Sequence, residues 1–368
     1  MPGRQLEFTG LADRDLTPFG GHRVQTLSAF SRPGCAHLVH VGGELLTCTA
    51  YQAAVMLLEP AEAAAAVGRY DSDPQAAATW AAQQLGTTQS MPYVAKRDAM
   101  ARNGRLIFHA LGGVDWASLT SSQRGEVLAA LKSADWVSVR DHFTRAALRA
   151  EGVEASLCPD PAVMVAECFG DVIEERRRQG ELAELPRHFP QGYLACQFSA
   201  EFADDATLTG MARGLASVCT ESGLGLVLFR GGAAPWHDSL EAYERLQAKL
   251  PVGIGQIFQS LHLWDICALI AASRGYCGSG LHGRILALAY GLPRVSLISP
   301  QQGARPSKVS AFAETWEPES VPRGVGASNI EAALRRSLAL PASTLRQTAA
   351  EMRDLYRASQ ARWTATLE

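Results

Sequence analysis

The amino-acid sequence predicts an α/β fold with two parallel sheets. Short apolar strands alternate with amphipathic helices in two stretches, which are separated by a charged segment near residues 171–191. Alternation of this kind is typical of parallel strands covered by helices. Apolar residues make up 47% of the 368 residues and charged residues 19%, so each stretch can bury a sizeable core.

The first unit is expected over residues 36–166. Its strands are predicted at 37–41, 106–110, 136–139 and 153–157. Gly42 and Gly43 close the first of these strands, and we expect a helix to open at Glu44. Further on, a helix carries an apolar stripe at 127–131, and another ends at Gly152, a suitable left-handed cap.

A charged segment separates the two units. Glu-Glu-Arg-Arg-Arg lies within 174–184, and Pro186 and Pro190 follow closely. We interpret this segment as a solvated helix leading into a linker, with the basic triplet as a polar face and not an anion site. The predicted domains are therefore an N-terminal unit at 1–188, a C-terminal unit at 189–343 and a crossing helix at 344–368.

The second unit repeats the alternation. Its strands are predicted at 193–198, 224–229, 252–256, 274–277 and 294–298. The helix at 261–272 has one apolar stripe, whereas the helix at 282–290 is apolar almost all round and should be buried. Two Rossmann-like, doubly wound halves predict a glycosyltransferase-B-like architecture, with the last helix packing back on the first half. Ligands are then expected in the inter-domain cleft, at the carboxyl ends of the strands.

Charge and composition restrict the partners. The net charge of −3 offers no electrostatic reason for a nucleic-acid or anionic-membrane partner. No apolar run approaches the ~20 residues of a membrane span, and residues 1–30 lack a signal core, so we expect a cytoplasmic protein. The eight cysteines lack metal-like spacing and are expected to be reduced core residues. No metal site is predicted, and a homo-oligomer stays open.

The most informative segment is 274–293, RGYCGSGLHGRILALAYGLP. A strand ends there, a glycine-rich loop follows, and a buried helix begins at once. Glycines let backbone N–H groups approach an anion, and the helix dipole adds roughly half a positive charge. Ser279 could cap the helix or donate to an anion, and His282 could contact a phosphate and carry a proton. The structural alternative is a tight turn with a capping serine and a packed histidine.

Other candidates are polar residues at strand ends or helix starts: Arg230, His237, Glu44, Arg140 and Asp141. Arg230 is a ligand cation or an inter-domain ion pair, and Glu44 is a base for an acceptor hydroxyl or a first-turn acid. His237 is a site residue or part of a surface polar pair. Arg140 and Asp141 bind ligand or fix the next helix.

Three stretches resemble the polysaccharide pyruvyl transferase family. SGLHGRILALAYGLP at 279–293 is similar to its signature, Ser-x-Arg-Leu-His-Gly, an aliphatic run and Gly-x-Pro. ADWVSVRD at 134–141, with Leu148, Gly152 and Pro-Asp-Pro at 159–161, is similar to a second family segment. VGGELL at 41–46 looks like its early glycine-rich turn. The stretches occur in the family order.

The resemblance implies transfer of a group from an anionic, phosphate-bearing donor, phosphoenolpyruvate, to a hydroxylated, sugar-containing acceptor. No further cofactor is implied. His282 and the backbone of Ser279, Gly280, Leu281 and Gly283 would serve the phosphate and the proton, and Arg230 or Arg284 would neutralise charge. Glu44 or Asp141 would serve the acceptor, while Gly42, Gly43, Arg140 and His237 would line the acceptor side of the cleft.

Two departures from the family pattern leave alternatives open. Gly280 stands where the family has an arginine, so Arg284 or Arg230 would have to supply the missing cation. Residues 1–35 also lack the family's opening strand and glycine-rich loop. A nucleotide-sugar glycosyltransferase, whose diphosphate would occupy the same helix terminus, and a non-catalytic ligand-binding relative are the alternatives.

Overall fold

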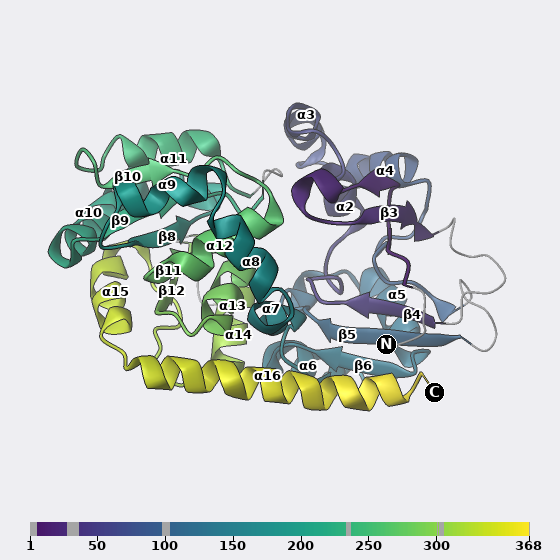
Figure 1. Ribbon diagram of the computed structural model, residues 1–368. Coiled ribbons are helices and arrows are strands. Elements are labelled where there is room, and N and C mark those ends of the chain that lie inside the picture. The colour runs from purple at the N-terminus through teal and green to yellow at the C-terminus, as the bar shows by residue number, and fades with distance from the viewer. Residues whose placement is uncertain are drawn as a thin grey trace. The chain divides into compact units, whose positions relative to one another are not determined.

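The computed structural model describes residues 6–27, 37–97, 104–232, 237–299, 301 and 305–367. The chain forms two compact units (Figure 1). Unit 1 consists of Met1–Cys158 and Ala358–Glu368, and unit 2 consists of Pro159–Arg357. Each unit contains a parallel sheet with helices packed on it, so the predicted α/β class is confirmed.

The sheet of unit 1 has the order β4-β5-β6-β7, with every neighbouring pair parallel. Its strands are β4 (His37–Val41), β5 (Arg105–Leu111), β6 (Trp136–Val139) and β7 (Ser156–Leu157). Phe108 packs in the same core as Val127 of α5 (Ser121–Lys132) and Leu148 of α6 (His142–Ala150). Successive strand residues point to opposite faces, so Ile107 packs elsewhere, against Trp363 near the C-terminus.

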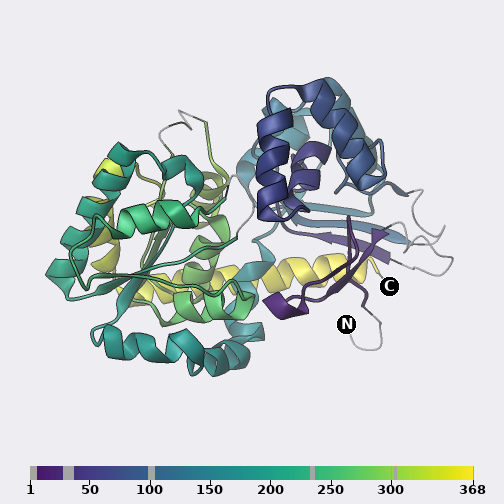
Figure 2. The same cartoon turned by 90° about the horizontal axis from the view of Figure 1, so that it is seen from above.

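Three short helices follow β4 in unit 1. They are α2 (Ala50–Met56), α3 (Pro60–Tyr70) and α4 (Pro74–Leu85), and Figure 2 shows them grouped on one side of the unit 1 sheet. The helix expected to open at Glu44 begins only at Ala50, because Thr49 and Gln52 form a capping box there. The described N-terminal residues form a small ribbon of β1 (Thr9–Gly10), β2 (Arg14–Asp15) and β3 (Arg23–Thr26).

The sheet of unit 2 has the order β10-β9-β8-β11-β12 and is parallel throughout. Its strands are β8 (Tyr193–Gln197), β9 (Gly225–Leu228), β10 (Gly255–Ile257), β11 (Gly275–Gly278) and β12 (Arg294–Ser296). The chain builds the sheet outward from β8 in one direction and then returns to its other side at β11. Such a switch point leaves a crevice at the carboxyl ends of its two strands, here β8 and β11.

Helices cover both faces of this sheet. One core joins Leu194 and Cys196 to α10 (Asp205–Ser222), α11 (Leu240–Gln247) and α15 (Ile330–Leu338). The other joins Tyr193 and Ala195 to α8 (Gly170–Arg177), α9 (Gly180–His188), α12 (Leu263–Ala272) and α13 (Leu281–Ala289). Adjacent residues of β8 therefore enter opposite cores, as the two-residue period of a strand requires.

Residues 159–188 differ from the expected linker. They contain η4 (Pro161–Met164), α7 (Val165–Cys168), α8 and α9, and they belong to unit 2. Ile173, Leu182 and Leu185 are buried in the unit 2 core with Tyr193, so only one face of this charged segment is solvated. The compact units consequently divide after Cys158, earlier than the boundary expected at 188/189.

The remaining elements complete the two units. They are η1 (Thr17–Phe19), η3 (Trp116–Ser118), η5 (Ala200–Phe202), α14 (Lys308–Trp316), η7 (Ala327–Asn329) and α16 (Ala342–Ala365). The residues of α16 from Ala358 onward are grouped with unit 1, and those up to Arg357 are grouped with unit 2. Within the described ranges, no helix has both the length and the apolar character of a membrane span.

The cysteines follow the expected pattern in most cases. Seven lie in described residues, and none of these seven forms a disulfide. Five of these are buried, namely Cys158, Cys196, Cys219, Cys267 and Cys277, so the prediction of reduced core cysteines is confirmed for them. Cys168 is exposed, Cys48 is half-buried, and Cys35 lies outside the described residues.

Candidate functional site

The turn between β11 and α13 lies at the switch point of the unit 2 sheet. Gly280 is the N-cap residue of α13 and supplies no capping side chain. The N–H groups of Leu281, His282 and Gly283 precede the first intrahelical hydrogen bond, which runs from Arg284 N to Gly280 O at 3.3 Å. Three backbone donors and the positive end of the helix dipole therefore face the same place, which suits an anion. We call residues 278–283 the donor turn.

Ser279 fixes this turn to the end of β8. Its Oγ accepts a hydrogen bond from Ser199 N at 3.0 Å, and its own N–H donates to Gln197 O at 3.1 Å. Ser279 therefore does not cap α13, which leaves the N-terminal donors of the helix uncapped. Of the two roles expected for this serine, the helix cap is absent, and its hydroxyl hydrogen stays available for an anion.

His282 lies in the first turn of α13 beside a carboxylate that the sequence interpretation did not single out. Its Nε2 is 3.7 Å from Asp160 Oδ2, and the imidazole is 62% exposed while the Asp160 side chain is 3% exposed. Asp160 also accepts from Ala162 N at 3.0 Å, so its position is fixed by the start of η4. Asp160 is therefore a fixed carboxylate beside the imidazole, which is a side chain able to give or take a proton.

Gln197 joins the donor turn to the next loop of the sheet. Its Oε1 accepts from Gly280 N at 2.8 Å and lies 3.3 Å from Tyr276 Oη. On its other side, its Nε2 donates to Asp238 Oδ1, and Gly231 N donates to Asp238 Oδ2. Gln197 and Asp238 are both 7% exposed. The two side chains therefore form a buried link between the donor turn and the loop that follows β9.

The carboxyl group of Asp238 has an unusual environment. Burial raises its pKa to about 6, although hydrogen bonds from Gly231 and Gln197 and the nearby Arg230 guanidinium oppose this change. Burial favours the neutral form of an acid because the charged form loses its hydration. The folded protein therefore holds a proton on Asp238 at pH values where the unfolded chain has released it.

This difference predicts a stability change with pH. Below pH 3.8 the raised pKa leaves the free energy of unfolding unchanged, because the carboxyl group is protonated in both states. Above pH 6 it lowers the free energy of unfolding by its full amount, on the order of 3 kcal/mol. We therefore expect Asp238→Asn to remove one component of the pH dependence of unfolding between pH 4 and 6. Denaturant melts of both proteins at several pH values measure this, and parallel curves would contradict the assignment.

Arg230 and His237 lie on the loop after β9. Arg230 Nε is buried and has no hydrogen-bond partner within the described residues, so this guanidinium can still bind a ligand. His237 has an exposed side chain, and its carbonyl accepts from Ala200 N at 2.8 Å. The structure thus brings Arg230 and His237 together with Asp238 on one loop, which Gln197 ties to the donor turn.

Arg284 does not supply the missing cation. Its side chain is fully buried, with Nε 2.6 Å from Glu317 Oε1 and Nη2 3.0 Å from Glu317 Oε2. Nη1 donates to Ser296 Oγ at 2.8 Å, and Glu317 also pairs with the buried Arg294. A buried guanidinium must be paired, and here the carboxylate comes from the end of α14 in the same unit. The expected reach of Arg284 to the donor turn is therefore corrected.

The candidates in unit 1 gather where β4, β5 and β6 end. Gly42 and Gly43 have φ angles of +62° and +73°, which favour glycine, and they turn the chain so that Glu44 Oε1 pairs with Arg140 Nη2. Arg140 is buried, whereas Glu44 Oε2 has no hydrogen-bond partner among the described residues. A Cβ at Gly112 would overlap both side chains, so this pair needs a glycine beside it.

Asp141 has a structural position. Its Oδ1 accepts from Thr144 N at 2.7 Å and its Oδ2 accepts from Thr144 Oγ1 at 2.9 Å, which caps α6. The residue is buried, and burial raises the pKa of its carboxyl group. Both oxygens thus bind Thr144, whereas Glu44 keeps one buried oxygen, Oε2, without a hydrogen-bond partner among the described residues.

A comparison with protein-family models matches residues 72–299 to the polysaccharide pyruvyl transferase model. The match covers more than half of the chain and includes both the donor turn and Arg140. The chain belongs to the polysaccharide pyruvyl transferase family. Membership of this family supports a transferase that modifies sugars.

Solved structures that match this pyruvyl transferase family member share little sequence with it. An α,α-trehalose 6-phosphate synthase from Burkholderia multivorans is 11% identical, with a TM-score of 0.48, and the match covers 88% of this chain and 80% of that one. A protein described as a UDP-N-acetylglucosamine 2-epimerase from Listeria monocytogenes is 13% identical, with a TM-score of 0.45 and 68% of this chain covered. The match spans 62% of that epimerase. A comparison with curated proteins found no match.

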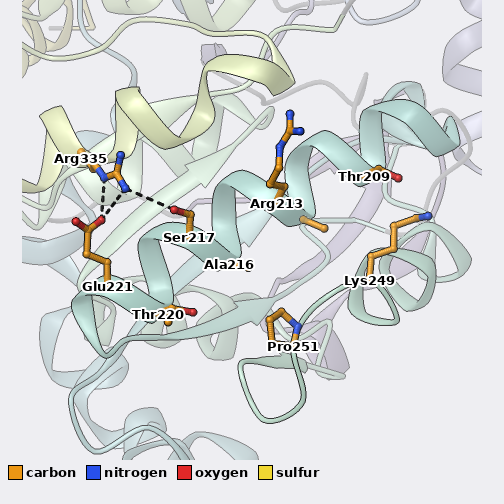
Figure 3. A pocket seen from close by; sticks show the side chains of 10 residues that line it. Thr209, Arg213, Ala216, Ser217, Thr220, Glu221, Lys249, Pro251 and Arg335 are labelled. Atoms are coloured by element: carbon orange, nitrogen blue, oxygen red, sulfur yellow. Dashed lines mark hydrogen bonds and ion pairs between the residues drawn. The ribbon is translucent and has the colours of Figure 1, made fainter.

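A surface pocket on α10 contains none of the predicted site residues of this family member. It has a volume of about 640 Å³ and is lined by residues of α10 and α15 and by the loop before β10. Figure 3 shows Arg335 against Glu221 and Ser217, and Lys249 pairs with Asp205 nearby. Most of its charges are therefore neutralised. No cluster of three metal-binding side chains occurs in the described ranges.

Proposed function

We propose that the chain transfers a pyruvyl group from phosphoenolpyruvate to two hydroxyl groups of a sugar-containing acceptor, with the donor held at the donor turn of unit 2. The observation that carries this proposal is the uncapped N-terminus of α13, where His282 is paired with the buried Asp160. One place thus offers anion donors and a positioned proton donor, and both are needed to activate an enol phosphate.

The proposed reaction starts with proton transfer from His282 to the methylene carbon of the donor. An acceptor hydroxyl then adds to the neighbouring carbon, and a second hydroxyl displaces inorganic phosphate to leave a cyclic ketal. The two hydroxyl protons balance the reaction: one returns to His282 and the other leaves with phosphate. The balance requires no oxidant, reductant or further cofactor.

The described residues have separate roles in this proposal. The N–H groups of Leu281, His282 and Gly283 bind the phosphate, and their stabilisation grows as negative charge develops on the leaving group. Arg230 supplies the cation, since its Nε has no partner within the described residues. Asp160 orients His282. In unit 1, Glu44 stays the predicted base for an acceptor hydroxyl, and its buried Oε2 has no hydrogen-bond partner in the part of the chain that the structure describes.

Arg230→Ala tests the binding part of this proposal. Loss of a charge-assisted contact to phosphate typically removes about 1.5–3 kcal/mol, so the affinity for phosphoenolpyruvate should fall by at least tenfold. Titration calorimetry on the full chain measures it. Arg187→Ala, which removes an exposed arginine paired with Glu184, is the matched control and should bind normally. Equal affinity in the Arg230 and Arg187 variants would remove Arg230 from the donor site.

A further inference from the structure

Gln197 occupies the space that a side chain at position 280 would need. A Cβ added to Gly280 would lie 2.5 Å from Gln197 Oε1, 3.3 Å from Gln197 Cδ and 3.5 Å from Tyr276 Oη. Real Cβ atoms essentially never approach other atoms to 2.5 Å. Because the neighbour is a side-chain end, the clash matters only if Gln197 is unable to move away.

Gln197 is held on both sides. Gly280 N and Asp238 Oδ1 bind the two ends of its amide, and the second oxygen of Asp238 is bound by Gly231 N. The side chain is 7% exposed, so a rotation would take away the acceptor of the half-buried Gly280 N–H and one of the donors to the buried Asp238 carboxylate. An unsatisfied buried polar group costs about 1–3 kcal/mol, more when it is charged. The position of the Gln197 side chain therefore depends on there being a glycine at position 280.

We propose that Gln197 and Asp238 are positioning residues that set the conformation and the specificity of the donor turn. The Gln197 amide fills the space where a side chain at position 280 would lie, so the turn contacts the phosphate of its ligand through backbone N–H groups. The cation comes from Arg230, on the loop that Asp238 holds. The inference rests on the proposed function for the identity of the ligand. It adds to that function a role for the buried link between the Gln197 amide and the Asp238 carboxylate. This link lies outside the first turn of α13 and controls how the turn recognises its ligand.

The link predicts non-additive effects of substitution. Gly280→Ala should lower phosphoenolpyruvate affinity about tenfold by displacing Gln197, and Gln197→Ala should lower it similarly by releasing Gly280 N and Asp238. The double variant should lose little more than either single variant, because both break the same link. Gly210→Ala, in which the added Cβ meets only Ala327 at 3.9 Å, and Gln247→Ala, which loses one 3.0 Å bond to Gly255 O, are the matched controls.

Gln197→Glu separates positioning from simple packing. When protonated, the introduced carboxyl group can donate to Asp238 as the amide does, whereas its ionised form would face the Asp238 carboxylate. Among the described residues, Arg230, Tyr243 and Tyr276 interact electrostatically with Asp238, and His237 precedes it in the chain. Relative to wild type at each pH, this variant should bind phosphoenolpyruvate normally at pH 5 and at least tenfold more weakly at pH 8. A ratio independent of pH, or additive single effects, would overturn the positioning role.

Failure of the proposed function would show itself differently. If wild type binds neither phosphoenolpyruvate nor inorganic phosphate, the donor assignment is wrong, and amide hydrogen exchange then decides the inference. Exchange in a peptide covering 278–284 should accelerate at least tenfold in Gln197→Ala and stay unchanged in Gln247→Ala. Equal exchange in these two variants would overturn the proposed link whatever the ligand is.

Discussion

Replacing Glu317 with alanine is expected to lower the free energy of unfolding by about 3–5 kcal/mol, the usual effect of breaking a buried ion pair. Its carboxylate is fully buried between two fully buried guanidiniums, with contacts of 2.6 Å to Arg284 and 2.7 Å to Arg294. Burial alone would raise the pKa of Glu317, yet the two arginines hold it below its usual value. The substitution therefore leaves two buried cations without their common partner.

A matched control isolates the effect of burial. Glu184 pairs with Arg187 on the surface of α9, and Glu184→Ala should cost no more than about 1 kcal/mol. Denaturant unfolding of both variants and wild type gives the comparison. A Glu317 variant as stable as the Glu184 variant would show that the Arg284–Glu317–Arg294 cluster is not formed, and Arg284 would again be available to the donor turn.

Replacing His282 with alanine is expected to reduce turnover by about 10²–10⁴-fold, the range for loss of a positioned acid or base. Phosphate release from phosphoenolpyruvate in the presence of a panel of sugar acceptors measures it. The melting temperature should change little, since the imidazole is 62% exposed and contributes little packing. His188→Ala on α9, another exposed histidine of unit 2, should retain full turnover.

Asp160→Asn completes this test. The amide keeps the size of the side chain but removes the carboxylate that lies 3.7 Å from His282 Nε2, so turnover should fall, though less than in His282→Ala. If His282→Ala retains full turnover on an acceptor that wild type uses, the histidine is a structural residue of the turn. If His282→Ala unfolds the protein, the imidazole is packed in the fold and is not the exposed side chain described above.

Periodic features of the chain predict most of the fold. Every strand expected from 37–41 to 294–298 is present within a few residues, because apolar runs bounded by glycine report burial directly. The prediction of a solvated helix and linker at 171–191 was incomplete. The many charged residues of this segment obscure the apolar face that Ile173, Leu182 and Leu185 form. Similarly, Glu44 follows a glycine pair but does not open a helix, because the capping box lies later, at Thr49.

The site was predicted less completely, for a physical reason. The donor turn is a local pattern, and His282 and Gly280 could be read from one short segment. Their partners are not local: Asp160 is far from His282 in the chain, and Gln197 is 83 residues from Gly280. A polar residue inside the apolar run 193–198 was the available signal for Gln197. Arg284 was misplaced because its carboxylate partner lies 33 residues further on.

Titration of the full chain with phosphoenolpyruvate and, separately, with UDP-glucose tests the central claim most directly. We predict saturable binding of phosphoenolpyruvate at one site, weakened at least tenfold in both Arg230→Ala and His282→Ala, and no comparable binding of UDP-glucose. Binding of UDP-glucose with no response to phosphoenolpyruvate would contradict the claim that the donor turn holds an enol phosphate.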